Sequence, residues 1–173
     1  MKKITSAPRR LEWVRPGALK MYYELRSDNE LIATLGFRSL LGSFATAESA
    51  DGCWTFKRIG FLQTRATIRA CGSDAEIATF KNNTWSGGGG LTLADGREFL
   101  VTTNVWQTQL EIQTAAGKVL VHLQTGGFGQ NSASVDVTPI GLQMPELPWM
   151  ALFAWYVIVM MQMDAGGVAA IST

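Results

Sequence analysis

The feature that most constrains the fold is an apolar run of fifteen residues near the C-terminus, residues 147–161. A helix built from this run is apolar on every side, so it must be buried all round, in protein or in lipid. Residues 145–148 (PELP) favour a helix start, because proline suits a first turn and glutamate suits the positive end of the helix dipole. Asp164 and the glycines at 166–167 indicate its end. The sequence predicts a hydrophobic α-helix at about residues 146–164.

Two environments can bury such a helix: a bilayer or the inside of a β-barrel. Spanning a bilayer takes about 20 apolar residues, with roughly 17 as the lower limit, and the uninterrupted run has fifteen. A longer segment takes in Gln162 and Asp164, and a carboxylate near a helix end is expensive in lipid. No cluster of Lys or Arg flanks the segment to orient it. A barrel plug is therefore favoured over a membrane anchor formed by residues 147–163.

The rest of the chain alternates short β-prone runs with turn residues. Asp-Gly at 51–52 and 95–96 suits the tight turns of hairpins, which require positive φ. The runs predict about twelve strands, at residues 11–14, 19–26, 30–37, 42–47, 53–59, 66–71, 76–81, 91–93, 98–102, 110–114, 119–123 and 132–137. A closed sheet of about twelve strands is wider than the roughly eight-stranded barrel that side chains alone can fill. We therefore expect a mainly β protein, a closed antiparallel barrel that encloses the C-terminal helix.

A chain of 173 residues fits one domain. We expect a flexible basic tail at residues 1–9, one barrel domain at 10–167 and a short tail at 168–173. The N-terminal Met-Lys-Lys resembles the start of a signal peptide, but no apolar segment follows it, so secretion is not expected.

Charge is distributed unevenly along the chain. Residues 1–69 carry twelve Lys or Arg against six Asp or Glu, and residues 70–173 carry three against eight. Such asymmetry can mark a surface for an acidic partner or an anionic membrane. The alternative is a basic N-terminal part that simply lies in solvent.

The two cysteines, Cys53 and Cys71, do not form a C-x-x-C pair, and a chain with so few cysteines is not a disulfide scaffold. We interpret them as reduced, half-buried strand residues of a cytoplasmic protein. A disulfide between them is the alternative.

No pattern indicates catalysis, a metal site or a cofactor. His122, the only histidine, lies in a predicted strand without a cluster of metal ligands around it. The four glycines at 87–90 lack the Lys-Ser/Thr of a phosphate-binding loop and are interpreted as a flexible connection. The glycine-rich segment 126–129 is interpreted in the same way. We therefore expect a protein that is not an enzyme.

The order of about twelve strands and one apolar C-terminal helix is similar to the tubby C-terminal-like superfamily, which includes the tubby domain, the phospholipid scramblases and the LURP-one-related proteins. The residues that carry the likeness are 54–58 (WTFKR), the hairpin 67–80 and the ending 147–164. The resemblance spans roughly residues 11–167 and implies a barrel with a buried helix. It also implies contact with phosphoinositides or other phospholipids through basic side chains on the outer surface. The scramblase calcium segment has no counterpart here.

These observations lead to one functional hypothesis with two alternatives. The chain is expected to be a non-enzymatic, cytoplasmic or peripheral membrane-binding module that binds an anionic lipid head group and no nucleic acid. The candidate ligand-binding residues are Lys20, Lys57, Arg58, Arg65 and Arg69. Lys57 and Arg58 are adjacent, so a strand would direct them to opposite faces. The alternatives are a structural or protein-interaction scaffold and a tail-anchored membrane protein.

Overall fold

The structure is a computed structural model of the chain. It describes residues 1–6, 10–60, 65–83, 88–126 and 132–171, with side chains described as far as residue 166. The strands are β1 (Arg10–Val14), β2 (Tyr22–Ser27), β3 (Glu30–Phe37), β4 (Ala45–Ser49), β5 (Gly52–Ile59), β6 (Arg65–Ala70), β7 (Glu76–Asn82), β8 (Gly89–Leu93), β9 (Glu98–Thr103), β10 (Gln109–Thr114), β11 (Val119–Thr125) and β12 (Ala133–Val137). The helices are the 3₁₀ turns η1 (Ile4–Ser6) and η2 (Gly141–Gln143), and α1 (Leu147–Ile171).

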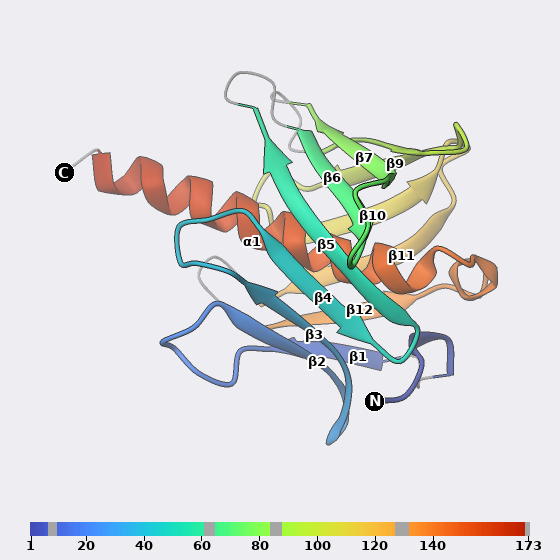
Figure 1. Cartoon of the computed structure of the whole chain (residues 1–173), viewed down its shortest axis with the longest axis horizontal. Coiled ribbons are helices and arrows are strands. Elements are labelled where there is room, and N and C mark those ends of the chain that lie inside the picture. Colours follow the sequence, from blue (N-terminus) through green and yellow to red (C-terminus); the bar gives the residue numbers. More distant parts are fainter. Residues whose placement is uncertain (7–9, 61–64, 84–87, 127–131, 172–173) are drawn as a thin grey trace.

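The twelve strands form one closed antiparallel barrel in which each strand pairs with its neighbours in sequence (Figure 1). The barrel closes where β1 pairs with β12, with Leu11 opposite Val135. Irregular register in the β2–β3, β6–β7 and β10–β11 pairs adds local bending, which helps a sheet to close. The predicted fold class, a mainly β closed barrel of twelve strands around a C-terminal helix, is confirmed.

Alternation of side chains along the strands separates the inside of the barrel from the outside. In β10, Leu110 and Ile112 are fully buried, whereas Gln109 on the opposite face is exposed. In β9, Phe99 and Val101 point inward and Leu100 lies outside. Burial with a period of two is expected of a sheet that has one face packed on the core and the other exposed to solvent.

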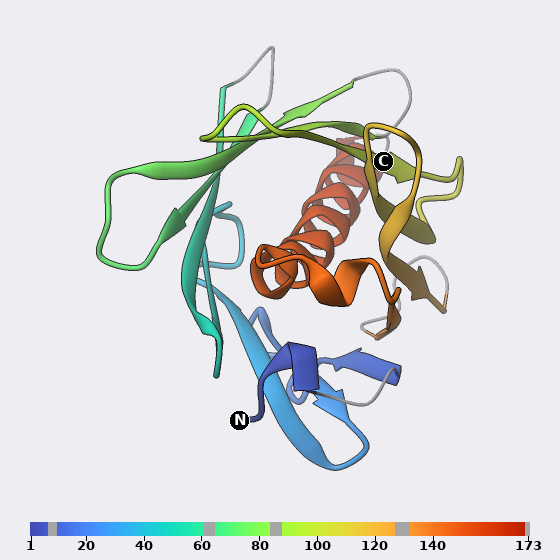
Figure 2. The ribbon, with the colours of Figure 1, turned by 90° about the vertical axis from the view of Figure 1, so that its right-hand side faces the viewer.

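Helix α1 fills the lumen (Figure 2). All residues from 147 to 160 are buried, on every side of the helix. Aromatic rings on the helix pack against rings on the strands: Trp155 stacks on Trp13 at a centroid distance of 5.9 Å, and Phe153 meets Phe56 at 5.4 Å edge to face. Such pairs contribute about 0.5–1.5 kcal/mol beyond their area burial. The helix is therefore the core of the domain.

The segment Leu147–Gly166 is, by length and composition, the one helix in the described part of the chain that could cross a membrane. Inside this structure 78% of its most apolar stretch of 18 residues is buried. Residues 147–160 cannot lie in the barrel and in a bilayer at once, so the structure favours the plug over the anchor.

Both predicted tails differ from the structure. Helix α1 does not stop at Asp164 but continues to Ile171, through the glycines expected to end it. Glycine permits a left-handed cap without requiring one, and no proline follows to break the helix. At the other terminus, Ile4 lies in η1, is buried, and donates its backbone N–H to Asp51 Oδ2 at 2.8 Å. Residues 4–6 are thus packed onto the barrel, and residues 7–9 of the predicted tail lie outside the described residues.

The prediction of reduced cysteines is wrong. Cys53 and Cys71 form a disulfide with a Cα–Cα distance of 5.4 Å. The register of β5 and β6 places Trp54 opposite Ala70, so one further step brings the two cysteines face to face. The Cys71 N–H donates to the Cys53 carbonyl at 3.0 Å, which continues the ladder to this pair.

The prediction of a flexible glycine connection is corrected in part. Gly89 and Gly90 begin β8, and Gly87 lies outside the described residues. A Cβ atom on Gly88 or Gly89 would collide with the carbonyl oxygen of Val101 or Lys81. These glycines therefore allow close backbone approach between neighbouring strands. In the second glycine segment only Gly126 is described.

Candidate functional site

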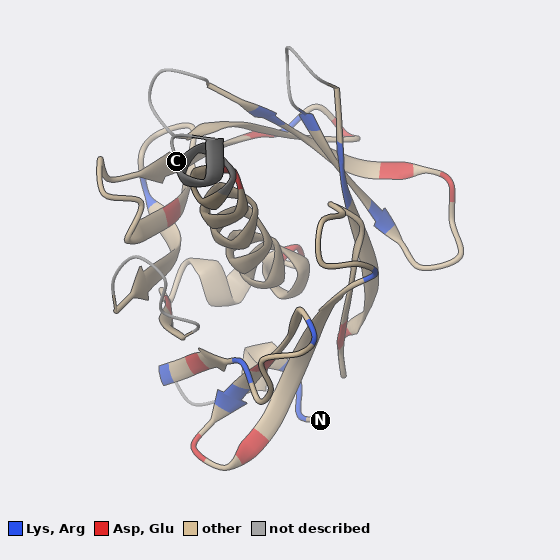
Figure 3. Ribbon diagram, turned by 90° about the vertical axis from the view of Figure 1, so that its left-hand side faces the viewer, with Lys and Arg blue, Asp and Glu red and all other residues tan. Residues whose placement is uncertain are grey.

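Helix α1 leaves the barrel at one end, which we call the exit rim. The connections β1–β2, β3–β4, β5–β6, β7–β8, β9–β10 and β11–β12 all lie at this end, because the strands alternate in direction. Its described residues are 15–21, 38–44, 60, 83, 88, 104–108, 126 and 132. Figure 3 looks onto this end, with the C-terminal end of α1 toward the viewer.

Large apolar side chains project from three connections of the exit rim. Leu19 is 91% exposed, Leu41 94%, Val105 92% and Trp106 78%. Leu40, beside Leu41, is also exposed. Single exposed apolar residues are ordinary. Here five of them lie on loops at one end of the barrel, and together they can contact an apolar surface. We call these five side chains the apolar tips.

The loops that carry these side chains are held by their own hydrogen bonds. Asn104 Oδ1 accepts the backbone N–H groups of Thr108 at 2.8 Å and Gln109 at 3.0 Å, which braces the turn that presents Val105 and Trp106. The Arg15 guanidinium donates to the carbonyls of Ala18 and Lys20, which braces the turn that presents Leu19. These hydrogen bonds thus stabilise the turns that present the apolar tips to solvent.

The third of these connections, β3–β4, is hydrogen-bonded to the helix. The Tyr156 hydroxyl on α1 donates to the Ser43 carbonyl at 2.8 Å. Tyr156 is almost fully buried, and this burial raises its pKa well above the ordinary value, against smaller opposing effects led by the nearby Arg58 charge. The tyrosine is therefore a neutral donor that fixes the β3–β4 connection.

The two ends of the barrel differ in charge. The described connections of the exit rim carry three cations and no Asp or Glu: Arg15, Lys20 and Arg38. Asp164 of α1 also lies at this end, paired with Arg58. Arg58, Arg65 and Lys81 lie at or next to the strand ends that lead into this rim. The connections at the opposite end carry five acidic and two basic residues, which are Asp28, Asp51, Asp74, Asp95 and Glu146, and Arg97 and Lys118. The N-terminal segment lies at the same end, where Lys2 pairs with Glu30, and adds the cations Lys2 and Lys3. The end whose described connections carry cations and no acidic residue is thus also the end with the apolar tips.

The structure spreads the five sequence-predicted residues over three places. Lys57, Arg65 and Arg69 lie on the outer face of β5 and β6, where Arg69 pairs with Glu76 at 3.1 Å. Lys20 lies in the β1–β2 connection.

Arg58 turns the other way from Lys57, toward the helix, where it pairs with Asp164 at 2.6 Å. The expectation that these neighbours face opposite sides is therefore confirmed, and the five residues do not form a single pocket.

Sequence reasoning missed the apolar tips and Arg38. A signal was present, because Leu40 and Leu41 sit beside glycine and serine and Val105 and Trp106 sit between polar residues, in predicted connections rather than strands. Strand periodicity does not explain exposed apolar residues in loops, so their presence there indicates another role.

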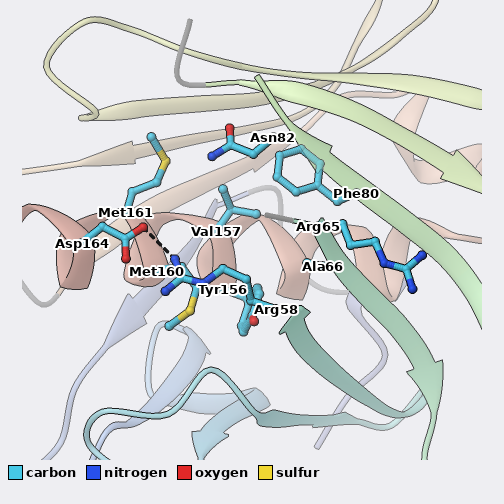
Figure 4. Close-up of a pocket in the computed structure, with 10 residues that line it drawn as sticks. All are labelled: Arg58, Arg65, Ala66, Phe80, Asn82, Tyr156, Val157, Met160, Met161 and Asp164. Atoms are coloured by element: carbon cyan, nitrogen blue, oxygen red, sulfur yellow. Dashed lines mark hydrogen bonds and ion pairs between the residues drawn. The ribbon is translucent and has the colours of Figure 1, made fainter. Parts of the chain in front are cut away.

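A pocket lies beside the helix at the exit rim, between α1 and strands β5 to β7 (Figure 4). Its walls are largely apolar: Ala66, Phe80, Val157, Met160 and Met161, with the ring of Tyr156. Its polar groups are Arg58, Arg65, Asn82 and Asp164.

His122 does not line this pocket. His122 Nδ1 lies 3.0 Å from Glu111 Oε1 in a cross-strand pair of β10 and β11. Among the described residues, no group of three or more His, Cys, Asp or Glu is arranged to hold a metal ion.

The fold and this surface define the class of protein as a closed twelve-stranded barrel, plugged by its own helix, with a cationic and apolar rim. No protein-family model, no curated protein and no solved structure matches the chain.

Proposed function

We propose that the protein is a non-enzymatic module that binds anionic membrane surfaces reversibly, with its exit rim facing the lipid. The observation that carries the proposal is the coincidence of exposed apolar loop tips and cationic side chains at the same end of the barrel. The tubby-like resemblance, which implies phospholipid contact, points in the same direction and stays a prediction.

The arrangement of the tips favours a flat apolar surface over a compact partner. Leu19 and Leu41 come from connections on one side of the rim, whereas Trp106 comes from the β9–β10 connection, several strands away on either path around the barrel. Side chains spaced around a rim can enter the same plane at once. A tryptophan also suits the membrane interface, where one edge of its ring is apolar and the other is polar.

The magnitudes suit reversible binding. A Lys or Arg close to an anionic membrane contributes about 1 kcal/mol, and burying a large apolar side chain contributes about 1.5–3 kcal/mol. Part of this gain is offset by the loss of translational and rotational freedom on binding. The sum favours recruitment that depends on anionic lipid and salt over permanent insertion.

Co-sedimentation with vesicles tests the proposal. Binding is expected to vesicles that contain phosphatidylserine, to weaken as salt is raised, and to be weak on pure phosphatidylcholine. The double variant Val105→Ser/Trp106→Ser should lower the partition coefficient by roughly tenfold or more. Lys20→Gln/Arg38→Gln should reduce the preference for anionic vesicles.

The matched control lies at the opposite end of the barrel. Ile140→Ser/Leu142→Ser removes two exposed apolar residues there, 43% and 37% exposed. This variant should bind vesicles as the wild type does. Equal loss in both variants, or binding that ignores anionic lipid, would overturn the proposal and would favour the alternative of a protein-interaction scaffold.

A further inference from the structure

The pocket beside α1 has a chemistry that the loop tips do not share. One helix face supplies Val157, Met160 and Met161 at intervals of three or four residues, so they line a single stripe. Phe80 and Ala66 form the facing wall from β7 and β6. Methionine side chains are flexible and polarisable, so this wall can adapt to an aliphatic chain.

A single cation lies inside the mouth of this apolar pocket. Arg58 points inward from β5, its side chain is 31% exposed, and Asp164 pairs with it at 2.6 Å. Asp164 is 58% exposed and lies on the last turns of α1 with described side chains. A pair this exposed is a weak interaction, so an anionic group from outside can take the place of the aspartate on the arginine. Asn82 also lines the pocket and provides a further donor, whereas Arg65 borders the pocket and directs its guanidinium away from it (Figure 4).

We propose that this pocket binds a single anionic amphiphile, with the aliphatic chain against the methionine stripe and the phosphate or carboxylate on Arg58 in place of Asp164. An anion with an aliphatic chain matches both halves of the pocket, whereas a free anion would leave the apolar walls unused. The inference goes beyond membrane docking, because the site accepts one molecule and is separate from the loop tips.

Methyl NMR of methionine-labelled protein tests the site with octyl phosphate below its micellar concentration. Octyl phosphate should shift the methyl signals of Met160 and Met161 in a saturable way. The signal of Met150, fully buried in the other half of the helix, serves as the internal reference and should stay in place. Octyl glucoside, with the same chain and no charge, should bind roughly tenfold more weakly, and inorganic phosphate should produce no saturable shift.

Two substitutions act in opposite directions. Arg58→Gln should weaken octyl phosphate binding by roughly tenfold, because it removes a charge-assisted hydrogen bond. Asp164→Asn should strengthen binding, because it removes the competing carboxylate. Arg97→Gln, which breaks an ion pair with Glu146 at the opposite end, is the matched control and should leave binding unchanged.

Equal affinity for octyl phosphate and octyl glucoside, or an unchanged affinity in both Arg58→Gln and Asp164→Asn, would overturn the proposed site. Vesicle docking is judged separately, through the Trp106 and Leu41 loops, none of whose residues lines the pocket. If the protein binds octyl phosphate and does not bind vesicles, the proposed function is wrong and this site stands. If it binds vesicles and does not bind octyl phosphate, this site is wrong and the proposed function stands.

Discussion

Tyr156 is the residue where the helix core and the exit rim meet. Its ring stacks on Phe37 at a centroid distance of 5.7 Å, and its hydroxyl holds the Ser43 carbonyl of the β3–β4 connection. The same ring forms part of the pocket beside α1. One hydroxyl therefore ties the plug to a loop that carries two of the apolar tips.

Tyr156→Phe is expected to lower the free energy of unfolding by about 1–2 kcal/mol, because the Ser43 carbonyl loses its donor in a partly buried place. Urea unfolding followed by circular dichroism would measure it. Tyr22→Phe, at an exposed tyrosine, should change the free energy little. Equal effects of the two substitutions would contradict this role.

The raised pKa of Tyr156 predicts a pH dependence as well. The folded protein keeps the proton to a higher pH than the unfolded chain, whose tyrosines ionise near pH 10. The unfolded state therefore binds fewer protons above that pH, and stability falls as the pH rises further. Stability curves between pH 8 and 11 should fall less steeply for Tyr156→Phe than for the wild type. Parallel curves would argue against a buried neutral tyrosine.

Single residues also show how far sequence reasoning reaches. That Lys57 and Arg58 face opposite sides follows from the period of two of a strand. That Arg58 finds Asp164, 106 residues away in the chain, does not, because the pairing depends on the position of the helix within the barrel.

At the scale of elements, the hairpin β5–β6 combines features of both ends of the barrel. It carries Arg58 and Arg65 toward the exit rim and the disulfide between Cys53 and Cys71 toward the opposite end. Disulfides persist mainly in oxidising compartments. The argument from reduced cysteines to the cytoplasm therefore fails, and a cytoplasmic location stays a prediction without that support.

Reducing the disulfide is expected to lower the free energy of unfolding by about 3 kcal/mol, because it closes a loop with a sequence separation of 18 and so restricts the unfolded chain. Urea denaturation with and without a phosphine reductant would measure the difference. Cys53→Ala/Cys71→Ala should be less stable than the oxidised wild type and insensitive to the reductant. Identical curves for the oxidised and reduced wild type would show that the bridge does not stabilise the fold.

The hairpins were predictable because several of their turns have a local chemistry: the Asp-Gly dipeptides and the Ser-Asp-Asn tripeptide act over a few residues. The residue at which α1 ends was not predictable. Glycine permits a helix to end without requiring it, and the tertiary surroundings decide whether the helix continues. The disulfide was left as an alternative, because the cysteine partners follow from strand register, which short turns do not specify alone.

At the scale of the whole molecule, the connections at the two ends of the barrel differ in charge. This difference is not the sequence contrast between residues 1–69 and 70–173, because Asp28 and Asp51 of the first part lie opposite the exit rim, and so do Lys2 and Lys3. The rim could have been derived from the predicted strand order, because in an up-and-down barrel every second connection lies at the same end. The apolar tips and cations belong to those alternate connections, whereas four of the five acidic turn residues follow even-numbered strands and the fifth, Glu146, precedes α1.

This polarity predicts a single orientation on the membrane. With anionic vesicles that contain lipids brominated on their acyl chains, fluorescence of the bound protein should be partly quenched through Trp106. Trp106→Phe should remove that component of the quenching and keep most of the binding, because a large apolar ring remains at the tip. A tryptophan introduced by Leu142→Trp, at the opposite end, should add emission that the brominated lipid does not quench. Quenching of the added tryptophan would mean that the barrel lies on the membrane in another orientation, with the end opposite the exit rim near the anionic lipid.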